Sequence, residues 1–194
     1  FQLSIEKEHL TKIIENMDEK KFVSRGGLKL EKALESFGVD VTGMTVLDVG
    51  SSTGGFVDCL LKHGAKKVYS VDTAYGELVY KLRIDPRVVV MERQNILFLE
   101  NLPEPVDLIT IDVTFTSLEK ILPVVSKFGS KIIALLKPQY EDQKLALKNK
   151  GIIPQENLQE IINRFKFDKI IDSPILGGSG NKEFLIYLNS SYAS

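Results

Sequence analysis

Residues 46–56 read Val46-Leu47-Asp48-Val49-Gly50-Ser51-Ser52-Thr53-Gly54-Gly55-Phe56, and this stretch decides the fold of the chain. An apolar run ends at a glycine-rich turn, and a helical pattern follows the turn. The next apolar run, 67–71, ends in Asp72. Parallel strands bring their carboxyl ends to one edge of a sheet, so the turn and the carboxylate of Asp72 are expected to meet there. The arrangement is typical of α/β sheets that hold a nucleoside-bearing cofactor.

The residues of the turn restrict which cofactor fits. Ser52 stands where the dinucleotide fingerprint Gly-x-Gly-x-x-Gly needs its second glycine, so a pyrophosphate cofactor is disfavoured. No Gly-Lys-Ser/Thr follows the turn, which disfavours an ATP or GTP cradle. A nucleoside cofactor without phosphates remains, with Asp72 accepting the ribose hydroxyls, and S-adenosylmethionine fits this description. The structural alternative is a glycine-rich turn that only makes a tight corner.

The composition is that of one compact domain. The chain has 194 residues, of which 43% are hydrophobic and 26% charged, enough for a sizeable core. Its 25 basic and 26 acidic residues give a net charge of -1, so any contact with nucleic acid must come from a local patch or from another domain. Cys59 is the single cysteine, and His9 and His63 are far apart, so we expect neither a disulfide nor a metal site. Without a signal peptide or a membrane-spanning run, a cytoplasmic location without membrane insertion is expected.

Alternating strand and helix patterns predict an α/β fold with a mostly parallel, seven-stranded sheet, an antiparallel last strand and helices on both faces. The expected strands cover 45–49, 67–71, 88–91, 107–112, 131–136, 169–172 and 184–188. The expected helices cover 3–20, 28–37, 54–63, 77–83 and 117–127, with a further helix beginning near Pro154. Residues 141–150 are expected to form a charged loop. The glycine-rich turn at 177–180 predicts a hairpin that closes the sheet edge.

Four ionisable residues are placed at strand ends or turns, where such a sheet gathers its active site. Asp112 and Lys137 each end an apolar strand, and Pro138 biases Lys137 toward extended backbone. Glu183 opens the last strand, and Lys29 lies on the helix entered through Arg25-Gly26-Gly27. Each could instead be a solvated charge or a helix cap, but sets of lysines and carboxylates are less often accidental than single residues.

Seven segments resemble the TlyA/hemolysin A family, which belongs to the FtsJ-like RNA 2′-O-methyltransferases. The segments are 22–30, 48–56, 71–76, 91–95, 112–115, 137–140 and 180–185. The resemblance implies a Rossmann-like, S-adenosylmethionine-dependent methyltransferase domain over 22–190, with an N-terminal helical segment over 1–21 and a tail over 191–194. Members of the family usually carry a small RNA-binding domain ahead of the methyltransferase domain, and we expect only the helical segment in its place.

The resemblance also implies the roles of particular residues. Lys29, Asp112, Lys137 and Glu183 match a Lys-Asp-Lys-Glu tetrad. A ribose 2′-hydroxyl must lose its proton to attack, so Lys137 is the candidate base, with Lys29 stabilising the developing alkoxide and the carboxylates orienting the lysines. The expected cofactor contacts are Gly50, Ser51, Ser52, Thr53, Gly54, Gly55, Phe56, Asp72, Asn95 and Asp112, where Asn95 matches the position that reads the adenine amino group. The candidate contacts to ribosomal RNA or ribosomal subunits are Arg25, Lys81 and Arg83.

Other functions stay open at this point. Amino-group methyltransferases typically carry Asn/Asp-Pro-Pro-Tyr/Phe where this chain has Asp112-Val113-Thr114-Phe115, which disfavours them. A small-molecule O-methyltransferase is harder to exclude; gathering of the candidate arginines and lysines, together with Arg87 and Arg93, on one face would favour RNA. The hemolysin label suggests action through membrane or RNA binding without catalysis, but the sequence shows no strongly basic amphipathic helix.

Overall fold

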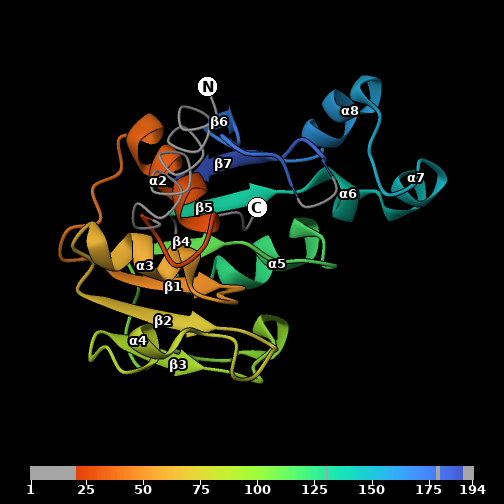
Figure 1. The fold of residues 1–194 in the computed structure, drawn as a ribbon. Coiled ribbons are helices and arrows are strands. Elements are labelled where there is room, and N and C mark those ends of the chain that lie inside the picture. The colour runs from red at the N-terminus through yellow and green to blue at the C-terminus, as the bar shows by residue number, and fades with distance from the viewer. Residues whose placement is uncertain (1–20, 130, 178–179, 190–194) are drawn as a thin grey trace, which may run out of the picture.

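The computed structural model describes residues 21–129, 131–177 and 180–189. Within them, seven strands form one sheet in the order β3-β2-β1-β4-β5-β7-β6 (Figure 1). The strands are β1 (Thr45–Val49), β2 (Lys67–Val71), β3 (Val88–Met91), β4 (Leu108–Ile111), β5 (Ile132–Leu136), β6 (Lys169–Asp172) and β7 (Phe184–Leu188). All seven predicted strands are confirmed, with bounds that differ by at most one residue at an end. The predicted helix over 3–20 and the tail over 191–194 lie outside the described residues.

The sheet is parallel except at β7. Strands β1 to β5 pair in parallel, whereas β7 runs antiparallel to both of its neighbours, β5 and β6. The predicted hairpin is therefore present at the sheet edge, with β6 as the outer strand and β7 as the inner one. This placement brings the start of β7, and Glu183 just before it, to the edge where the parallel strands end.

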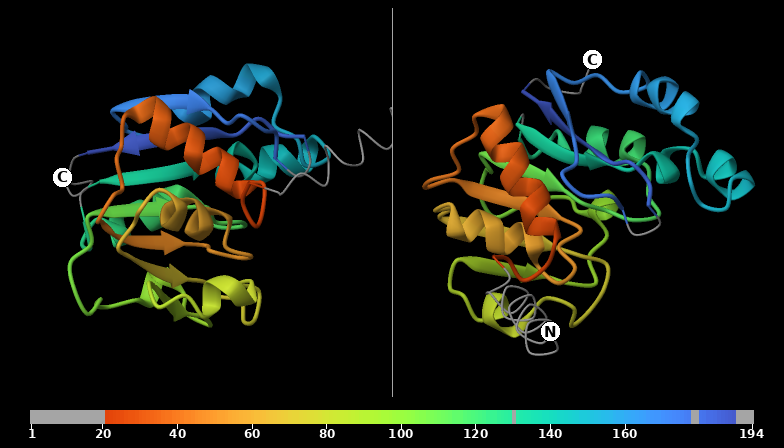
Figure 2. Two further views of the ribbon diagram at one scale, coloured as in Figure 1. Left: turned by 60° about the vertical axis from the view of Figure 1, so that its left-hand side comes forward. Right: turned by 45° about the horizontal axis from the view of Figure 1, so that its top comes forward.

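Helices cover both faces of the sheet (Figure 2). Helices α2 (Gly26–Phe37), α3 (Gly55–Lys62) and α4 (Tyr80–Arg83) lie on one face; α5 (Leu118–Val125) and α8 (Leu158–Ile162) lie on the other. Successive strand residues point to opposite faces, so Val46 packs with the first set of helices and Leu47 with the second. The central strands are buried on both sides, which explains their nearly continuous apolar sequences.

The strand order reverses between β1 and β4. The loops that follow these two strands therefore diverge, and a crevice forms between them at the carboxyl ends of the strands. Gly50 follows β1 with φ +84°, and a Cβ at this position would clash with the backbone carbonyl of Asp112, which follows β4. Glycine is thus required for the two strand ends to lie side by side. The close approach sets the position of Asp112 at the carboxyl edge of the sheet.

The predicted charged loop over 141–150 is wrong. Two short helices occupy this part of the chain, α6 (Pro138–Glu141) and α7 (Gln143–Lys148). The Asp142 carboxylate accepts a hydrogen bond from the backbone N of Leu145 at 2.9 Å, and Ala146 is buried, so a cap and an apolar contact hold α7. The helix expected near Pro154 begins with a 3₁₀ turn, η2 (Gln155–Asn157), and another such turn, η1 (Ile96–Phe98), follows β3.

Candidate active site

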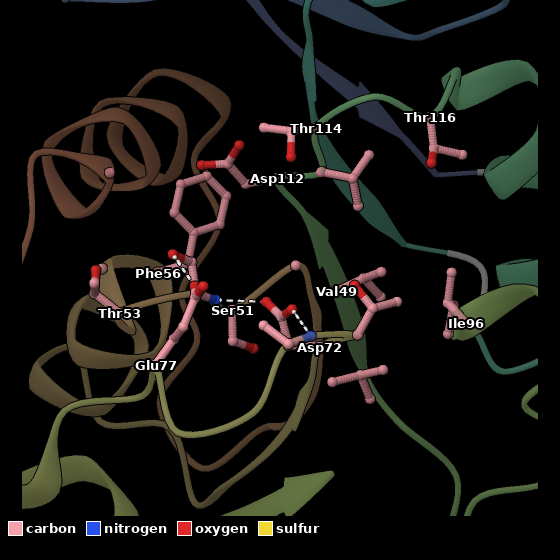
Figure 3. Close-up of a pocket in the computed structure, with 18 of the residues that line it drawn as sticks. Val49, Ser51, Thr53, Phe56, Asp72, Glu77, Ile96, Asp112, Thr114 and Thr116 are labelled. Atoms are coloured by element: carbon pink, nitrogen blue, oxygen red, sulfur yellow. Dashed lines mark hydrogen bonds between the residues drawn. The ribbon is translucent and has the colours of Figure 1, made fainter. Parts of the chain in front are cut away.

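A cavity of about 550 Å³ opens at the carboxyl edge of the sheet. Its walls come from the start of α2 and from the segments that follow β1, β2, β3, β4, β5 and β6. Figure 3 shows part of this wall, with the Phe56 ring next to Asp112. The volume lies within the range of cavities that hold cofactors and small ligands.

The glycine-rich turn is held in shape by contacts within the protein. Gly55 lets α3 approach α2, because a Cβ there would clash with the Ser24 hydroxyl. Ser52 has φ +46°, and its backbone N donates to Asp72 Oδ2 at 2.7 Å, while its hydroxyl donates to Glu77 Oε2 at 3.1 Å (Figure 3). Ser52 therefore connects the turn after β1 to the loop after β2.

Asp72 presents a fixed carboxylate to the cavity. Its Oδ1 accepts from the backbone N of Ala74 at 2.8 Å, and its Oδ2 accepts from Ser52. Each carboxylate oxygen has two acceptor sites, so both can still receive a ligand hydroxyl. The geometry suits a carboxylate that reads vicinal hydroxyls.

The predicted lysines and carboxylates form two pairs at the other end of the cavity. Lys29 Nζ lies 2.5 Å from Glu183 Oε2, and Lys137 Nζ lies 2.6 Å from Asp112 Oδ1. The second contact is an ion pair without hydrogen-bond alignment. Lys29, Lys137 and Glu183 are 9%, 8% and 4% exposed, so their charges are compensated mainly by one another. Lys29, Asp112 and Lys137 line the cavity, and Glu183 reaches it through Lys29.

Local sequence explains why these side chains are held in place. Lys137 is extended, with ψ 95°, because Pro138 follows it and begins α6. Glu183 packs against Gly177, where a Cβ would clash with Glu183 Oε1. The buried amide of Asn181 accepts from Ile153 N at 2.9 Å and donates to Gly151 O at 2.8 Å, which anchors the turn before β7.

The remaining predicted site residues differ in their positions. Gly50, Ser51, Thr53, Phe56, Asn95 and Arg25 all line the cavity. The side-chain amide oxygen of Asn95, Oδ1, accepts from Leu97 N at 3.0 Å and caps η1, which leaves this oxygen one further acceptor site. Lys81 lies 3.8 Å from Asp58, and Arg83 forms a bidentate pair with Glu92, so both charges are engaged by neighbouring carboxylates.

Several cavity residues were not expected from the sequence. Glu77, Gln94, Ile175 and Leu176 line the cavity from loops that have no distinctive motif. Only the position of Glu77 five residues after the strand-end carboxylate Asp72 could have pointed to it. Asp112 does not cap the helix that follows β4. Ser117 caps this helix instead, because its hydroxyl accepts from Glu119 N at 3.1 Å. Asp112 is thereby left to face Lys137.

Asp48 is a buried carboxyl directly beneath the turn. Its Oδ1 accepts from the Thr110 hydroxyl at 2.6 Å, whereas its Oδ2 has no partner among the described residues. Burial raises the pKa of Asp48 to about 7. The hydrogen bond from Thr110 to Asp48 therefore connects β4 to β1, while burial of the unpaired Oδ2 disfavours the charged form of the carboxyl.

Fold and site together define a Rossmann-like α/β domain with a nucleoside-type cavity at its switch point. The chain belongs to the FtsJ-like methyltransferase family, whose model matches residues 22–190. It is 42% identical to "Hemolysin A" of Brachyspira hyodysenteriae, with coverage of 90% of this chain and 79% of that one. It is 38% identical to the "16S/23S rRNA (cytidine-2'-O)-methyltransferase TlyA" of Mycobacterium tuberculosis, with coverage of 89% and 70%.

Two further similarities extend these findings. A candidate rRNA methyltransferase of Bacillus subtilis is 45% identical, and the chain spans 66% of its length. A solved structure of a hemolysin candidate from Streptococcus thermophilus superposes with a TM-score of 0.84 at 39% identity, covering 90% of this chain and 69% of that one. The family and the fold predicted from the sequence are thus confirmed.

The residues of the cavity fit S-adenosylmethionine, the cofactor of this class of methyltransferase. The carboxylates of Asp72, Glu77 and Asp112 line the cavity and would face the sulfonium and ammonium groups of this cofactor. Glu77, whose carboxylate accepts a hydrogen bond from the Ser52 hydroxyl, would oppose the phosphates of a dinucleotide. Among the described residues, no group of three or more His, Cys, Asp and Glu side chains could hold a metal ion. Over the same ranges, no helix is long and apolar enough to span a membrane.

Proposed function

We propose that this chain methylates a ribose 2′-hydroxyl of ribosomal RNA. The observation that carries the proposal is the pairing of Lys29 with Glu183 and of Lys137 with Asp112 beside the cavity. A hydroxyl acceptor needs a base, and a buried lysine amine at the end of a strand can serve as one. The names of the Mycobacterium and Bacillus relatives supply the class of substrate.

The four paired residues divide the work of activating the hydroxyl. The bound cofactor supplies an electrophilic methyl group. Lys137 Nζ, as the free amine, accepts the proton of the 2′-hydroxyl, and Asp112 holds that amine at the cavity wall. Lys29, held by Glu183, places a positive charge where the oxygen develops negative charge. Asp72 and the turn after β1 fix the position of the cofactor, so the two reactants meet in a defined orientation.

Exposed aromatic side chains support RNA over a small molecule as the acceptor. Phe115, three residues after Asp112, is 78% exposed and has φ +62°, an unfavourable backbone conformation for a phenylalanine. Its ring contacts Tyr140, three residues after Lys137. Tyr75 is 68% exposed and lies under the Arg93 guanidinium at 4.3 Å. Unpaired bases of RNA stack on such rings, whereas a small acceptor would leave them uncovered.

Methyl transfer from labelled S-adenosylmethionine to 16S and 23S rRNA and to ribosomal subunits tests the proposal. Under single-turnover conditions Lys137→Ala should slow transfer about 100-fold or more. Cofactor binding, followed by calorimetry, should be nearly unchanged in the variant.

Glu104→Ala is the control, because Glu104 pairs with Lys67 and Tyr69 away from the cavity. Retained transfer in Lys137→Ala would remove this lysine as the base. Methyl transfer to base nitrogens would indicate an amino-group methyltransferase instead. Transfer only to small hydroxyl compounds would indicate a small-molecule O-methyltransferase, and liposome leakage without any transfer would indicate action on membranes without catalysis.

A further inference from the structure

The spur of the molecule is the segment 143–152, formed by α7 and the turn that follows it. Figure 1 shows α7 projecting beyond the carboxyl end of β5, and α7 packs mainly against α6. The segment has the sequence Gln143-Lys144-Leu145-Ala146-Leu147-Lys148-Asn149-Lys150-Gly151-Ile152. No part of the tetrad or of the cavity lining comes from it.

The surface of the spur is positively charged. Lys144, Lys148 and Lys150 are exposed, and within the described ranges none of them lies within ion-pair distance of a carboxylate. The two acidic residues just before the spur are occupied: Glu141 is buried against the start of α5, and Asp142 caps α7. In a chain with a net charge of -1, three uncompensated lysines within seven residues form a local basic patch.

Backbone conformation adds a second observation. Lys150 has φ +56°, a left-handed conformation that is unfavourable for a lysine and ordinary for a glycine. The conformation closes α7, since Gly151 N donates to Ala146 O at 2.8 Å. A lysine at this position adds a third exposed basic side chain to the segment.

The spur adjoins the acceptor end of the site rather than the cofactor end. It is connected to Lys137 through α6, and the Gln143 amide donates to the carbonyl of Phe115 at 3.3 Å. The cofactor end, in contrast, is lined by the carboxylates of Asp72 and Glu77. A polyanion that enters the site from the acceptor end would pass the spur.

We propose that the spur binds the phosphodiester backbone of the RNA substrate, with Lys144, Lys148 and Lys150 contacting phosphates. Lys144 and Lys148 are four residues apart and share one face of α7. Leu147, which is 80% exposed, is three residues after Lys144 and beside that pair, and it can cover a ribose. Contacts of this kind position RNA without reading its sequence. This inference rests on the proposed function, because it takes RNA as the substrate.

The test compares two triple variants of the whole chain with equal loss of charge. One is Lys144→Gln/Lys148→Gln/Lys150→Gln. The control is Lys66→Gln/Lys131→Gln/Lys166→Gln, whose positions precede β2, β5 and β6 and lie at the opposite edge of the sheet. Binding to protein-free 16S and 23S rRNA is measured without cofactor over a range of salt concentrations, and S-adenosylmethionine affinity and melting temperature are measured alongside.

The spur variant should reduce the slope of log K against log salt by about 2, and bind RNA roughly 10- to 100-fold more weakly near 0.1 M salt. The control should keep the wild-type slope, and both variants should keep the wild-type cofactor affinity. Equal losses in both variants, or wild-type binding by the spur variant, would overturn the inference.

Weaker binding to intact subunits alone, with normal binding to protein-free rRNA, would overturn it in favour of a ribosomal protein as the partner. If only the spur variant binds rRNA more weakly, and the wild-type protein transfers no methyl group, the proposed function is overturned while the RNA contact is supported.

Discussion

At the scale of single residues, Asp48 connects stability to pH. The pKa of its carboxyl is about 7 in the folded chain against an ordinary value of 3.8. A raised acid pKa means that the carboxyl's contribution is fully present below pH 4 and is lost as the pH rises through 7. Asp48→Asn, which keeps an acceptor for Thr110, should therefore gain stability relative to wild type between pH 5 and 8, by up to roughly 4 kcal/mol.

Urea unfolding at pH 5, 6, 7 and 8 measures this difference. Asp40→Asn is the control, because the hydroxyl of Thr42 lowers the pKa of the exposed Asp40, which therefore titrates below this range. A constant difference between Asp48→Asn and wild type at all four pH values would contradict the prediction.

At the scale of elements, Glu141 joins the segment that carries Lys137 to the helix that follows Asp112. Its Oε1 accepts from Leu118 N at 2.9 Å and its Oε2 from the Ser117 hydroxyl, and burial raises its pKa. Because a neutral acceptor suits this place, Glu141→Gln should remain near wild-type stability. Glu141→Ala leaves the Leu118 N–H unsatisfied and should cost about 1–3 kcal/mol.

Urea unfolding combined with single-turnover methyl transfer checks the role of Glu141. Glu141→Ala should also slow transfer, since α6 directly follows Lys137. Glu104→Ala is again the control, because it removes a carboxylate that lies away from the cavity. An equal loss of stability in Glu141→Gln and Glu141→Ala would show that the negative charge, rather than a neutral hydrogen-bond acceptor, matters at this position.

Elements differed in how far the sequence predicts them. Strands β1, β4 and β5 are buried on both faces, so their apolar runs are visible without tertiary information. The short helices α6 and α7 are stabilised by caps and by packing on neighbouring elements, and the lysines of 143–150 conceal the weak apolar pattern. Local sequence therefore predicted the sheet and missed the spur.

At the scale of the whole molecule, cofactor binding should stabilise the domain. The cavity joins α2 to the segments after six strands, so a bound ligand would connect both halves of the sheet. S-adenosylmethionine at 100 times its Kd should add about 2.7 kcal/mol and raise the melting temperature by roughly 5–10 °C. Asp72→Asn should reduce this shift strongly, because its carboxylate is proposed to bind the ribose.

Thermal melts with and without the cofactor test this prediction, with Asp85→Asn as a control carboxylate that pairs with Arg87 outside the cavity. The control should keep the full shift. An absent shift in the wild-type protein at saturating cofactor would count against the cavity as its binding site.

Local sequence predicted the position of a candidate site residue only where that residue directly follows a strand. Asp72, Asp112 and Lys137 could be placed because each follows an apolar run, and Pro138 orients Lys137. The family resemblance placed Lys29 and Glu183 in one tetrad, but their pairing was not predicted, since 154 residues separate them. Glu77, Leu176 and the contact of Gly177 with Glu183 depend on loop conformations that carry no local signature.

The inner position of β7 has a consequence for the order of folding during synthesis. Residues 184–188 follow every other strand in the chain, yet they pair between β5 and β6. A growing chain can form the parallel strands early, but β5 keeps one unpaired edge until β7 arrives. The same event delivers Glu183 to Lys29, so closing the sheet and completing the charge pairs are one step. A nascent chain that stops before β7 would have the cofactor cavity without its full set of paired charges.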